Sequence, residues 1–479
     1  MVLRTLRAAG GALALVAGAA ALCQTAAPPA QIPTASPSLP APSTDPLHID
    51  FSGDPVLRLA RRQTPPDQFR ALVGSAVERH PGTLEAEATT AEAGAVVSEA
   101  YERRLPSIDL TVQNYQVLAR QFSNDPNNII ERTRAHARTD AQLSITQNIF
   151  DFGASADRVA AAGARLRAAA ADAEASADNI ALTTIAAWYD VFAYRALVGL
   201  TQNFVANQQE LRAAVEERVR QGVSAPGDTA RVESYLASAQ TRLASFRRLM
   251  ANAEARFTQL TGAPPPPSLD RAPVAELPAM SKDAAALAAM SAPQPRAAQA
   301  TADAARQEAK ATRADRMPQI SVGLDAGRYG VFENTQDYDV RGRVTYRQHL
   351  FGGTESRLAQ ANARARSADA RASRIRDEAA RDASIAWSDV QALEEQLRAM
   401  EASYTASRRS RDVLVERFIN ARGNLFDVVA AEDSYFETAT SYIRALSELD
   451  AARYVLLSRT GGLLKELRID PLKVGGRRD

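Results

Sequence analysis

Two long segments, residues 154–221 and 354–421, carry apolar side chains at alternating steps of three and four positions. Four residues show this spacing in the first segment: Leu182, Ile185, Tyr189 and Phe192. The spacing places apolar side chains on one stripe of a helix and is typical of coiled coils. At 1.5 Å per residue each helix would be ~100 Å long, well beyond a bilayer core of ~30 Å. The pattern predicts two very long, closely packed helices.

Four shorter segments alternate apolar and polar residues with a period of two: residues 106–118, 138–150, 318–329 and 338–351. In the first segment Ile108, Leu110 and Val112 share one side. In the last segment three arginines share the polar side: Arg341, Arg343 and Arg347. Such alternation predicts strands with one apolar face, as a transmembrane barrel strand needs. A half-buried soluble sheet alternates in the same way, so the pattern alone leaves both interpretations open.

The chain contains an internal duplication with an offset of 199 positions (417 − 218). The offset relates Arg218 to Arg417 and Asp228 to Asp427, within the stretches "ERVRQGVSAPGDTARVESYLASAQTRL" and "ERFINARGNLFDVVAAEDSYFETATSYI". Two copies at so long a period predict two large repeats rather than a solenoid. The repeats span residues 67–264 and 283–464, separated by a Pro-rich linker at 265–282 and followed by a tail at 465–479.

Each repeat predicts the same order of elements: a helix, two strands, the long helix, a break and a return helix. The first helices are expected at residues 71–104 and 283–316, each ending before a proline. The breaks, or tips, are expected at residues 222–228 and 422–427, and the return helices at 229–262 and 428–460.

The N-terminus predicts export from the cytoplasm. Residues 1–26 have a basic start, an apolar run and small residues, as a secretory signal peptide does. Residues 27–66 are rich in Pro, Ala and Ser, which predicts a disordered or extended lead-in. Cys23 follows the apolar run as in a lipoprotein, but Leu22 precedes it where a small residue is expected, so a cysteine lost with the signal peptide is favoured.

Composition argues against several classes of function. The net charge of +1 favours no nucleic-acid partner, and aromatic residues make up only 6% of the chain. The four histidines have no metal-ligand spacing, and one cysteine offers no thiolate cluster. The sequence also lacks a phosphate-binding glycine loop and a nucleophile motif. We therefore expect no enzymatic activity, no cofactor and no metal.

With its duplicated halves, its "LF-G-G"-like turns after the second strand of each half and its "G-x5-D" breaks, the chain resembles the TolC family of outer-membrane efflux and secretion channels. The resemblance covers residues 63–472 and looks closer to members that serve type I secretion. It implies a mainly α fold with a transmembrane β-barrel part, in which a homotrimer shares twelve strands, four per protomer, above a coiled-coil tunnel. It also implies an outer-membrane location with the tunnel in the periplasm, contact with outer-membrane lipid, a periplasmic adaptor, and an inner-membrane ABC or proton-driven transporter.

The resemblance also implies roles for particular residues at the periplasmic end of the tunnel. Seven residues would form or hold the gate: Asp228, Asp427, Phe418, Arg218, Arg417, Leu425 and Phe426. Six would lie at the tips that dock an adaptor: Gly222, Val223, Gly227, Arg422, Gly423 and Asn424. Arg341, Arg343 and Arg347 would line the barrel lumen. Where the family has a second constriction acid, a tip glycine and a basic residue, this chain has Ala430, Ala421 and Gly423.

Each of these roles has a simpler structural alternative. Asp228 and Asp427 precede predicted helices and would serve as N-caps in any protein. Arg218 and Arg417 could be ordinary coiled-coil surface charges. The three barrel arginines could pair with acids on the same sheet: Asp109, Asp325 or Asp339. Since Phe418 has no hydroxyl for a polar lock, we expect closure of the tip to rest on apolar packing.

The sequence interpretation is a passive outer-membrane exit duct, with type I protein secretion as the favoured export system. Multidrug efflux is the first alternative. A periplasmic coiled-coil scaffold without a pore is the alternative from another functional class.

Overall fold

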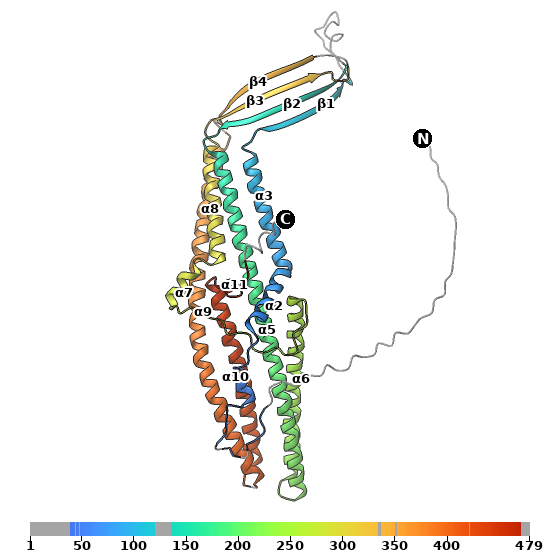
Figure 1. The fold of residues 1–479 in the computed structure, drawn as a ribbon, viewed down its shortest axis with the longest axis vertical. Coiled ribbons are helices and arrows are strands. Elements are labelled where there is room, and N and C mark those ends of the chain that lie inside the picture. The colour runs from blue at the N-terminus through green and yellow to red at the C-terminus, as the bar shows by residue number, and fades with distance from the viewer. Residues whose placement is uncertain are drawn as a thin grey trace, which may run out of the picture.

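The computed structural model describes residues 39–43, 45–46, 48–119, 136–333, 337–349, 352–420 and 422–470. The predicted signal peptide at residues 1–26, with Cys23, lies outside these ranges. The protein is an elongated helical body with a small antiparallel sheet at one end, and the two helical tips lie at the other end (Figure 1).

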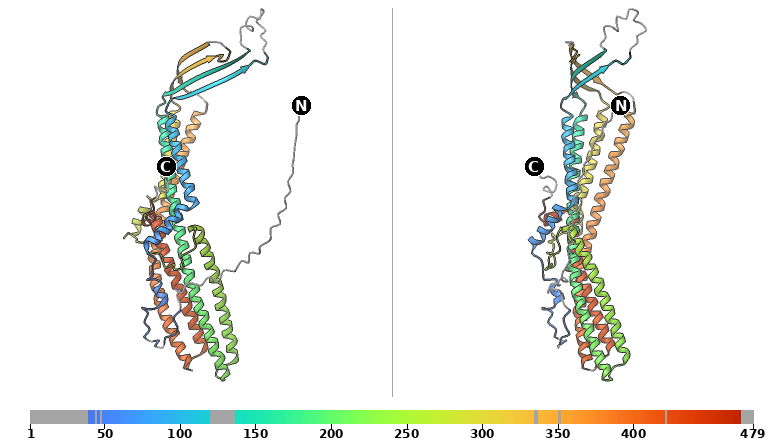
Figure 2. Two further views of the ribbon diagram at one scale, coloured as in Figure 1. Left: turned by 45° about the vertical axis from the view of Figure 1, so that its right-hand side comes forward. Right: turned by 90° about the vertical axis from the view of Figure 1, so that its right-hand side faces the viewer.

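Two helices run the whole length of the body: α5 (Ala154–Arg220) and α9 (Thr354–Ile419). In the half next to the sheet they are joined by α3 (Pro81–Glu102) and α8 (Pro293–Ala314). In the other half they are joined by α6 (Pro226–Thr261) and α10 (Leu425–Arg459) (Figure 2). Among the described residues, no helix combines the length and the apolar character that crossing a membrane requires.

The helix expected at the start of each repeat is two helices, which corrects the prediction. The first repeat has α2 (Pro66–Arg79) and α3, with a break at His80. The second has α7 (Lys282–Ala289) and α8, with a break before Pro293. Proline at the first helical position lacks an N–H that a continuing helix would need, so Pro81 and Pro293 each start a new helix.

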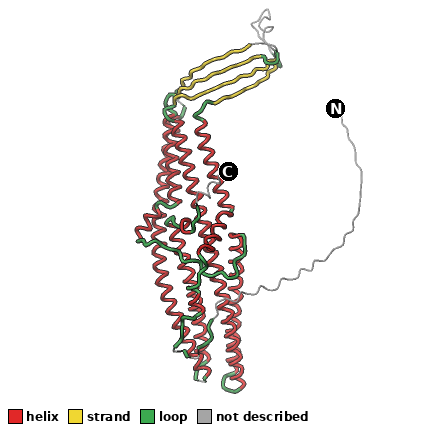
Figure 3. Tube along the Cα trace, in the orientation of Figure 1, coloured by secondary structure: helices red, strands yellow, loops and turns green. Residues whose placement is uncertain are grey.

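The sheet has the order β1 (Ser107–Gln116), β2 (Ala137–Phe150), β3 (Gln319–Tyr329) and β4 (Asp337–Arg347), all antiparallel. Figure 3 shows the strands side by side at the end of the helical body. Its register places one row of apolar residues side by side on one face: Leu110, Leu143, Ala326 and Val340. This face is open to solvent in the single chain, with Leu110 71% and Val344 74% exposed. The period-two prediction of one apolar face is confirmed.

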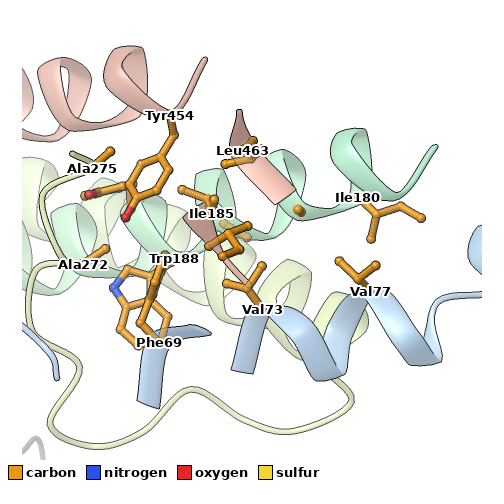
Figure 4. Close-up of a cluster of buried hydrophobic side chains, with 14 of the residues drawn as sticks. Phe69, Val73, Val77, Ile180, Ile185, Trp188, Ala272, Ala275, Tyr454 and Leu463 are labelled. Atoms are coloured by element: carbon orange, nitrogen blue, oxygen red, sulfur yellow. The ribbon is translucent and has the colours of Figure 1, made fainter. Parts of the chain in front are cut away.

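The middle of the body contains an aromatic core where the two repeats meet (Figure 4). Phe69 of α2 meets Trp188 of α5 edge to face, with ring centroids 5.2 Å apart. The indole N–H of Trp188 donates to the carbonyl of Asp270 at 3.0 Å, and that of Trp387, its counterpart in the second repeat, donates to Met280 at 3.0 Å. The duplicated tryptophans therefore fasten the two ends of the Pro-rich segment between the repeats.

The expectation for the lead-in was a disordered or extended segment, and its described part packs against the body, which excludes disorder for those residues. Residues 39–43, 45–46 and 48–62, here called the strap, lie along α9 and include a short helix, α1 (Pro55–Arg58). Asp54 caps α1 and accepts hydrogen bonds from the Tyr404 hydroxyl at 2.9 and 3.0 Å. Val56 and Leu57 are buried. The contacts of Asp54 are polar, so they leave no regular apolar spacing in the sequence. Composition alone therefore predicted a disordered or extended segment.

The predicted tail begins inside a short helix, α11 (Leu463–Glu466), rather than after the last helix. Arg70 of α2 binds the Glu466 carboxylate at 3.0 Å, and Leu467 is buried. The start of the tail is therefore part of the body. Residues 471–479 lie outside the described ranges.

Candidate functional site

The first tip is a five-residue turn between α5 and α6. The chain leaves α5 at Arg220 and passes through Gly222 at a φ of 74°, a conformation that favours glycine. The backbone N–H groups of Val223 and Ser224 donate to the carbonyl of Arg218, which closes the turn. The Val223 side chain is 59% exposed at the end of the molecule. Gly227 lies in the first turn of α6.

The second tip lies between α9 and α10. Arg422 donates its backbone N–H to the carbonyl of Arg417 at 2.9 Å, and the Asn424 side chain caps α10 by accepting from the Phe426 N–H at 3.1 Å. A Cβ on Gly423 would lie 2.9 Å from the backbone nitrogen of Phe418. Gly423 is therefore required for the chain to fold back on α9, which is a structural reason for glycine at this position.

The two tip aspartates are not N-caps, which corrects that alternative. Asp228 and Asp427 each occupy the third position of a helix that starts earlier than predicted, at Pro226 and Leu425. The Asp228 carboxylate accepts a hydrogen bond from the Ala225 N–H at 3.3 Å, as a first-turn acid does in half of a capping box. Negative charge in the first turn also complements the helix dipole.

One contact joins the α5–α6 hairpin to the α9–α10 hairpin. It involves Arg218 and Phe418, which the sequence analysis named as gate residues without predicting that they touch. The Arg218 guanidinium lies over the Phe418 ring, 4.5 Å from its centroid, and donates to the Phe418 carbonyl at 3.0 Å. A second arginine, Arg231 of α6, lies 4.1 Å from the Phe426 ring of α10. Arg218 therefore contacts the opposite tip and is more than an isolated surface charge, whereas Arg417 is exposed.

An apolar cluster lies immediately behind the tips and draws on all four helices. It contains six buried residues: Val215, Val232, Phe418, Leu425, Val428 and Val429. Phe418 is only 5% exposed, whereas Phe426 is 50% exposed and lies outside the cluster. Asp427 and Ala430 are exposed. Two of the three predicted apolar closure residues, Phe418 and Leu425, are thus brought together, and Phe426 is not.

A buried ionic network, which the sequence analysis missed, lies between this cluster and the middle of the body. Arg411 binds the carboxylates of Asp412 at 2.6 Å and Glu432 at 3.3 Å, and Arg408 binds Asp54 of the strap. Burial raises the pKa of Asp412 and of Glu432, since an apolar environment disfavours the charged form. The sequence offered one signal, Arg408 and Asp412 one turn apart on α9, but the partners Asp54 and Glu432 lie on other segments.

The arginines of β4 lie on the polar face of the sheet. Arg341 binds Asp339, with its Nε 2.7 Å from a carboxylate oxygen, and Arg343 lies 3.8 Å from Asp325. The pairing alternative therefore holds for these two residues. Arg347 is exposed at the end of the strand.

A family model described as outer membrane efflux protein matches residues 72–263 and 285–462, one stretch in each half of the duplicated chain. The chain belongs to the outer membrane efflux protein family. Family membership confirms the resemblance to TolC-like channels and the outer-membrane location, and it agrees with the prediction that the protein is not an enzyme, because the family consists of channel proteins.

Comparisons with individual proteins agree with this family assignment. Outer membrane efflux protein BepC of Brucella suis biovar 1 (strain 1330) is 24% identical over 325 residues, 67% of this chain and 71% of BepC. The outer membrane protein VceC of Vibrio cholerae has a TM-score of 0.72 at 18% identity, covering 82% of this chain and 96% of VceC. The CmeC outer membrane channel of Campylobacter jejuni has a TM-score of 0.72 at 14% identity, covering 82% of this chain and 86% of CmeC. These structures show the shared fold.

Proposed function

We propose that three copies of this chain form the exit duct of a tripartite export system. The family match over both halves carries this proposal. The sheet supports it, because its apolar face is exposed in one chain and, among the described residues, the outer edges of β1 and β4 pair with no further strand. Three sheets joined edge to edge, β4 of one copy to β1 of the next, would close twelve strands (3 × 4) into an antiparallel barrel without edges. Lipid would then cover the apolar face.

The helical body would continue the passage through the periplasm, and the tips would face the transport partners. A periplasmic adaptor would dock on the exposed turns around Val223 and Asn424, and an inner-membrane ABC or proton-driven transporter would supply the energy. The predicted docking residues support this assignment, because most of both turns is exposed at the far end from the sheet.

We propose small molecules as the exported cargo. The description of the matched family and of BepC as efflux proteins favours this choice. This order reverses the sequence-based expectation, which favoured type I protein secretion. Secretion becomes the second candidate, supported by the C-terminal sequence "AARYVLLSRTGGLLKEL", which resembles members that serve secretion.

The closed tip would rest on apolar packing with a minor contribution from charge. Phe418 and Leu425 lie in the buried cluster, whereas Asp427 is exposed and so contributes at most a screened interaction. The contact of Arg218 with the Phe418 ring and carbonyl would hold the two hairpins of one chain together.

A deletion strain tests the function and separates the two cargoes. Loss of the gene should raise the cellular accumulation of a fluorescent efflux dye. The wild-type gene on a plasmid should return the accumulation to the wild-type level. Protein secretion would instead appear as a polypeptide missing from the culture medium, with dye accumulation unchanged. Unchanged dye levels and an unchanged set of secreted proteins would contradict the exit-duct proposal.

A further inference from the structure

The four helices below the sheet form a layer with two open edges. α3 packs on α5, α5 on α8, and α8 on α9, which leaves α3 and α9 as the outermost helices (Figure 2). A closed ring of copies repeats one contact between unlike surfaces, here the α3 edge of one copy and the α9 edge of the next. The side chains on these two edges therefore decide how copies fit together.

The α3 edge is acidic. Helix α3 contains five glutamates and no lysine or arginine. Three of them, Glu85, Glu92 and Glu99, recur every seventh residue and are exposed. A seven-residue spacing keeps side chains on one stripe of a helix. This stripe lies opposite the side that packs against the body, where Thr83 and Thr90 are buried.

The α9 edge carries both charges in the same half of the body, with three exposed arginines among them. Arg366, Arg374 and Arg381 recur at steps of eight and seven residues, and all three are exposed. The side of the helix that packs against its neighbour is marked by buried Ala365 and Ala372. Arg374 and Arg381 therefore point away from α8, toward the position of a neighbouring copy, and Arg366 lies at the margin of that side.

Half of these six charges have an ionic partner in their own chain, and each of those pairs is largely exposed. Among the described residues, Glu92 and Arg366 have no ionic or hydrogen-bonding partner. Glu99 binds Arg103 at 2.6 Å, Arg374 binds Glu378 at 2.7 Å and Arg381 binds Asp382 at 2.7 Å. Such exposed pairs contribute little free energy, so they can exchange partners in an assembly. Both edges thus keep charge available for a partner of opposite sign.

The two stripes also lie at matching heights. Contacts across the layer fix how the helices are aligned along the body. Gly82 of α3 lies beside Ile180 of α5, Arg165 of α5 binds Glu308 of α8 at 3.0 Å, and Arg306 of α8 binds Asp369 of α9 at 2.5 Å. Carried across all four helices, this alignment puts residue 92 of α3 near the height of residue 370 of α9. Each glutamate then lies within about one helical turn, ~5 Å along the axis, of one arginine. A rotation about the long axis preserves these heights in the neighbouring copy.

We propose that Glu85, Glu92 and Glu99 form a charge seam with Arg381, Arg374 and Arg366 of a second copy of this chain. This inference rests on the proposed trimer and adds which surfaces join and which charges specify the join. Because α3 carries only acids, contact of the α3 edge with a second α3 edge would bring like charges together, which disfavours it. The arginines of α9 instead favour the head-to-tail contact of a closed ring.

Charge reversal with rescue is the first test. A variant with Glu85, Glu92 and Glu99 changed to Arg should give severalfold less trimer in detergent, measured by native mass spectrometry. Circular dichroism should show unchanged helix content, because the three side chains are exposed in the single chain. Combining these changes with Arg366→Glu, Arg374→Glu and Arg381→Glu should restore the trimer. Wild-type trimer yield from the first variant, or no rescue in the combination, would overturn the seam.

Cysteine cross-linking is the second test and does not depend on charge. In a Cys23→Ser background, which removes the natural cysteine, Glu92→Cys with Ala370→Cys should form disulfides under mild oxidation. The two positions lie on opposite edges of one chain, so any bond must join two copies, and denaturing gels without reductant should show linked chains. The matched control, Glu92→Cys with Ser356→Cys, places the thiols about two heptads apart, ~20 Å, and should not link.

The two tests separate failure of the seam from failure of the trimer. A native trimer whose Glu92→Cys and Ala370→Cys thiols do not link would refute the seam and leave the proposed function standing. A chain that stays monomeric in its wild-type form would contradict the proposed trimer itself. Linking of the control pair as efficiently as the test pair would also refute the seam, because it would mean contact without the stated alignment.

Discussion

Replacing Phe418 by alanine is expected to loosen the closed tip. The ring is only 5% exposed within a cluster of six buried residues, and Arg218 lies 4.5 Å from its centroid. Truncating a buried phenylalanine costs ~3–5 kcal/mol, and the lost cation–π contact ~0.5–1 kcal/mol. The hydrogen bond from Arg218 to the Phe418 carbonyl survives, because it involves the backbone. Since the cluster lies at the end of the body and can relax, we expect the low end, ~3 kcal/mol in each chain.

A change of ~3 kcal/mol shifts the ratio of open to closed tips by about 10²-fold, since each 1.4 kcal/mol is a factor of ten. The assay is single-channel conductance in a planar bilayer, where Phe418→Ala should raise the resting conductance. Phe426→Ala is the matched control, because that ring is 50% exposed and outside the cluster, and it should change conductance little. The reasoning is refuted if Asp427→Ala opens the pore widely and Phe418→Ala has no effect.

Three further predictions concern the sheet, the strap and the buried network. Leu143→Arg, on the apolar face, should cost ~2–4 kcal/mol near a bilayer midplane and lower the yield of membrane-inserted protein, whereas Thr111→Arg on the polar face should not. Asp54→Ala should leave Arg408 buried without its partner and cost ~3–5 kcal/mol, measured as a lower thermal midpoint and faster proteolysis of the strap; an unchanged midpoint would mean the strap contributes no stability. Burial raises the pKa of Glu432, so the folded chain binds this proton more readily than the unfolded chain, and stability should rise as pH falls through the folded pKa. Glu432→Gln should flatten this pH dependence of the thermal midpoint, and an identical slope would contradict the assignment.

The elements that follow a regular period were predictable from the sequence. The long helices were expected at residues 154–221 and 354–421 and run over Ala154–Arg220 and Thr354–Ile419. Their seams repeat every three or four residues, which only a helix places on one side. The strands were predictable for the same reason. A period of two predicts a strand and also predicts which of its residues share the apolar face.

Features that depend on single residues were harder to predict. The early start of α6 and α10 was missed, because Pro226 and the Asn424 cap override the aspartates as start signals. The strap was missed, because Asp54 is anchored by Arg408, 354 positions away, and no local pattern reveals so distant a partner. Arg218 was named as a candidate tip contact, but its partner, the ring and carbonyl of Phe418, required the arrangement of both hairpins.

An electron cryo-microscopy structure of the full-length protein, extracted from outer membranes, tests the central claim most directly. The account predicts a threefold particle in which three sheets form one closed barrel and the helical bodies enclose a continuous passage, narrowed at the tips around Phe418. A monomer, or a helical assembly without an axial passage, would contradict the claim that this protein is an export duct.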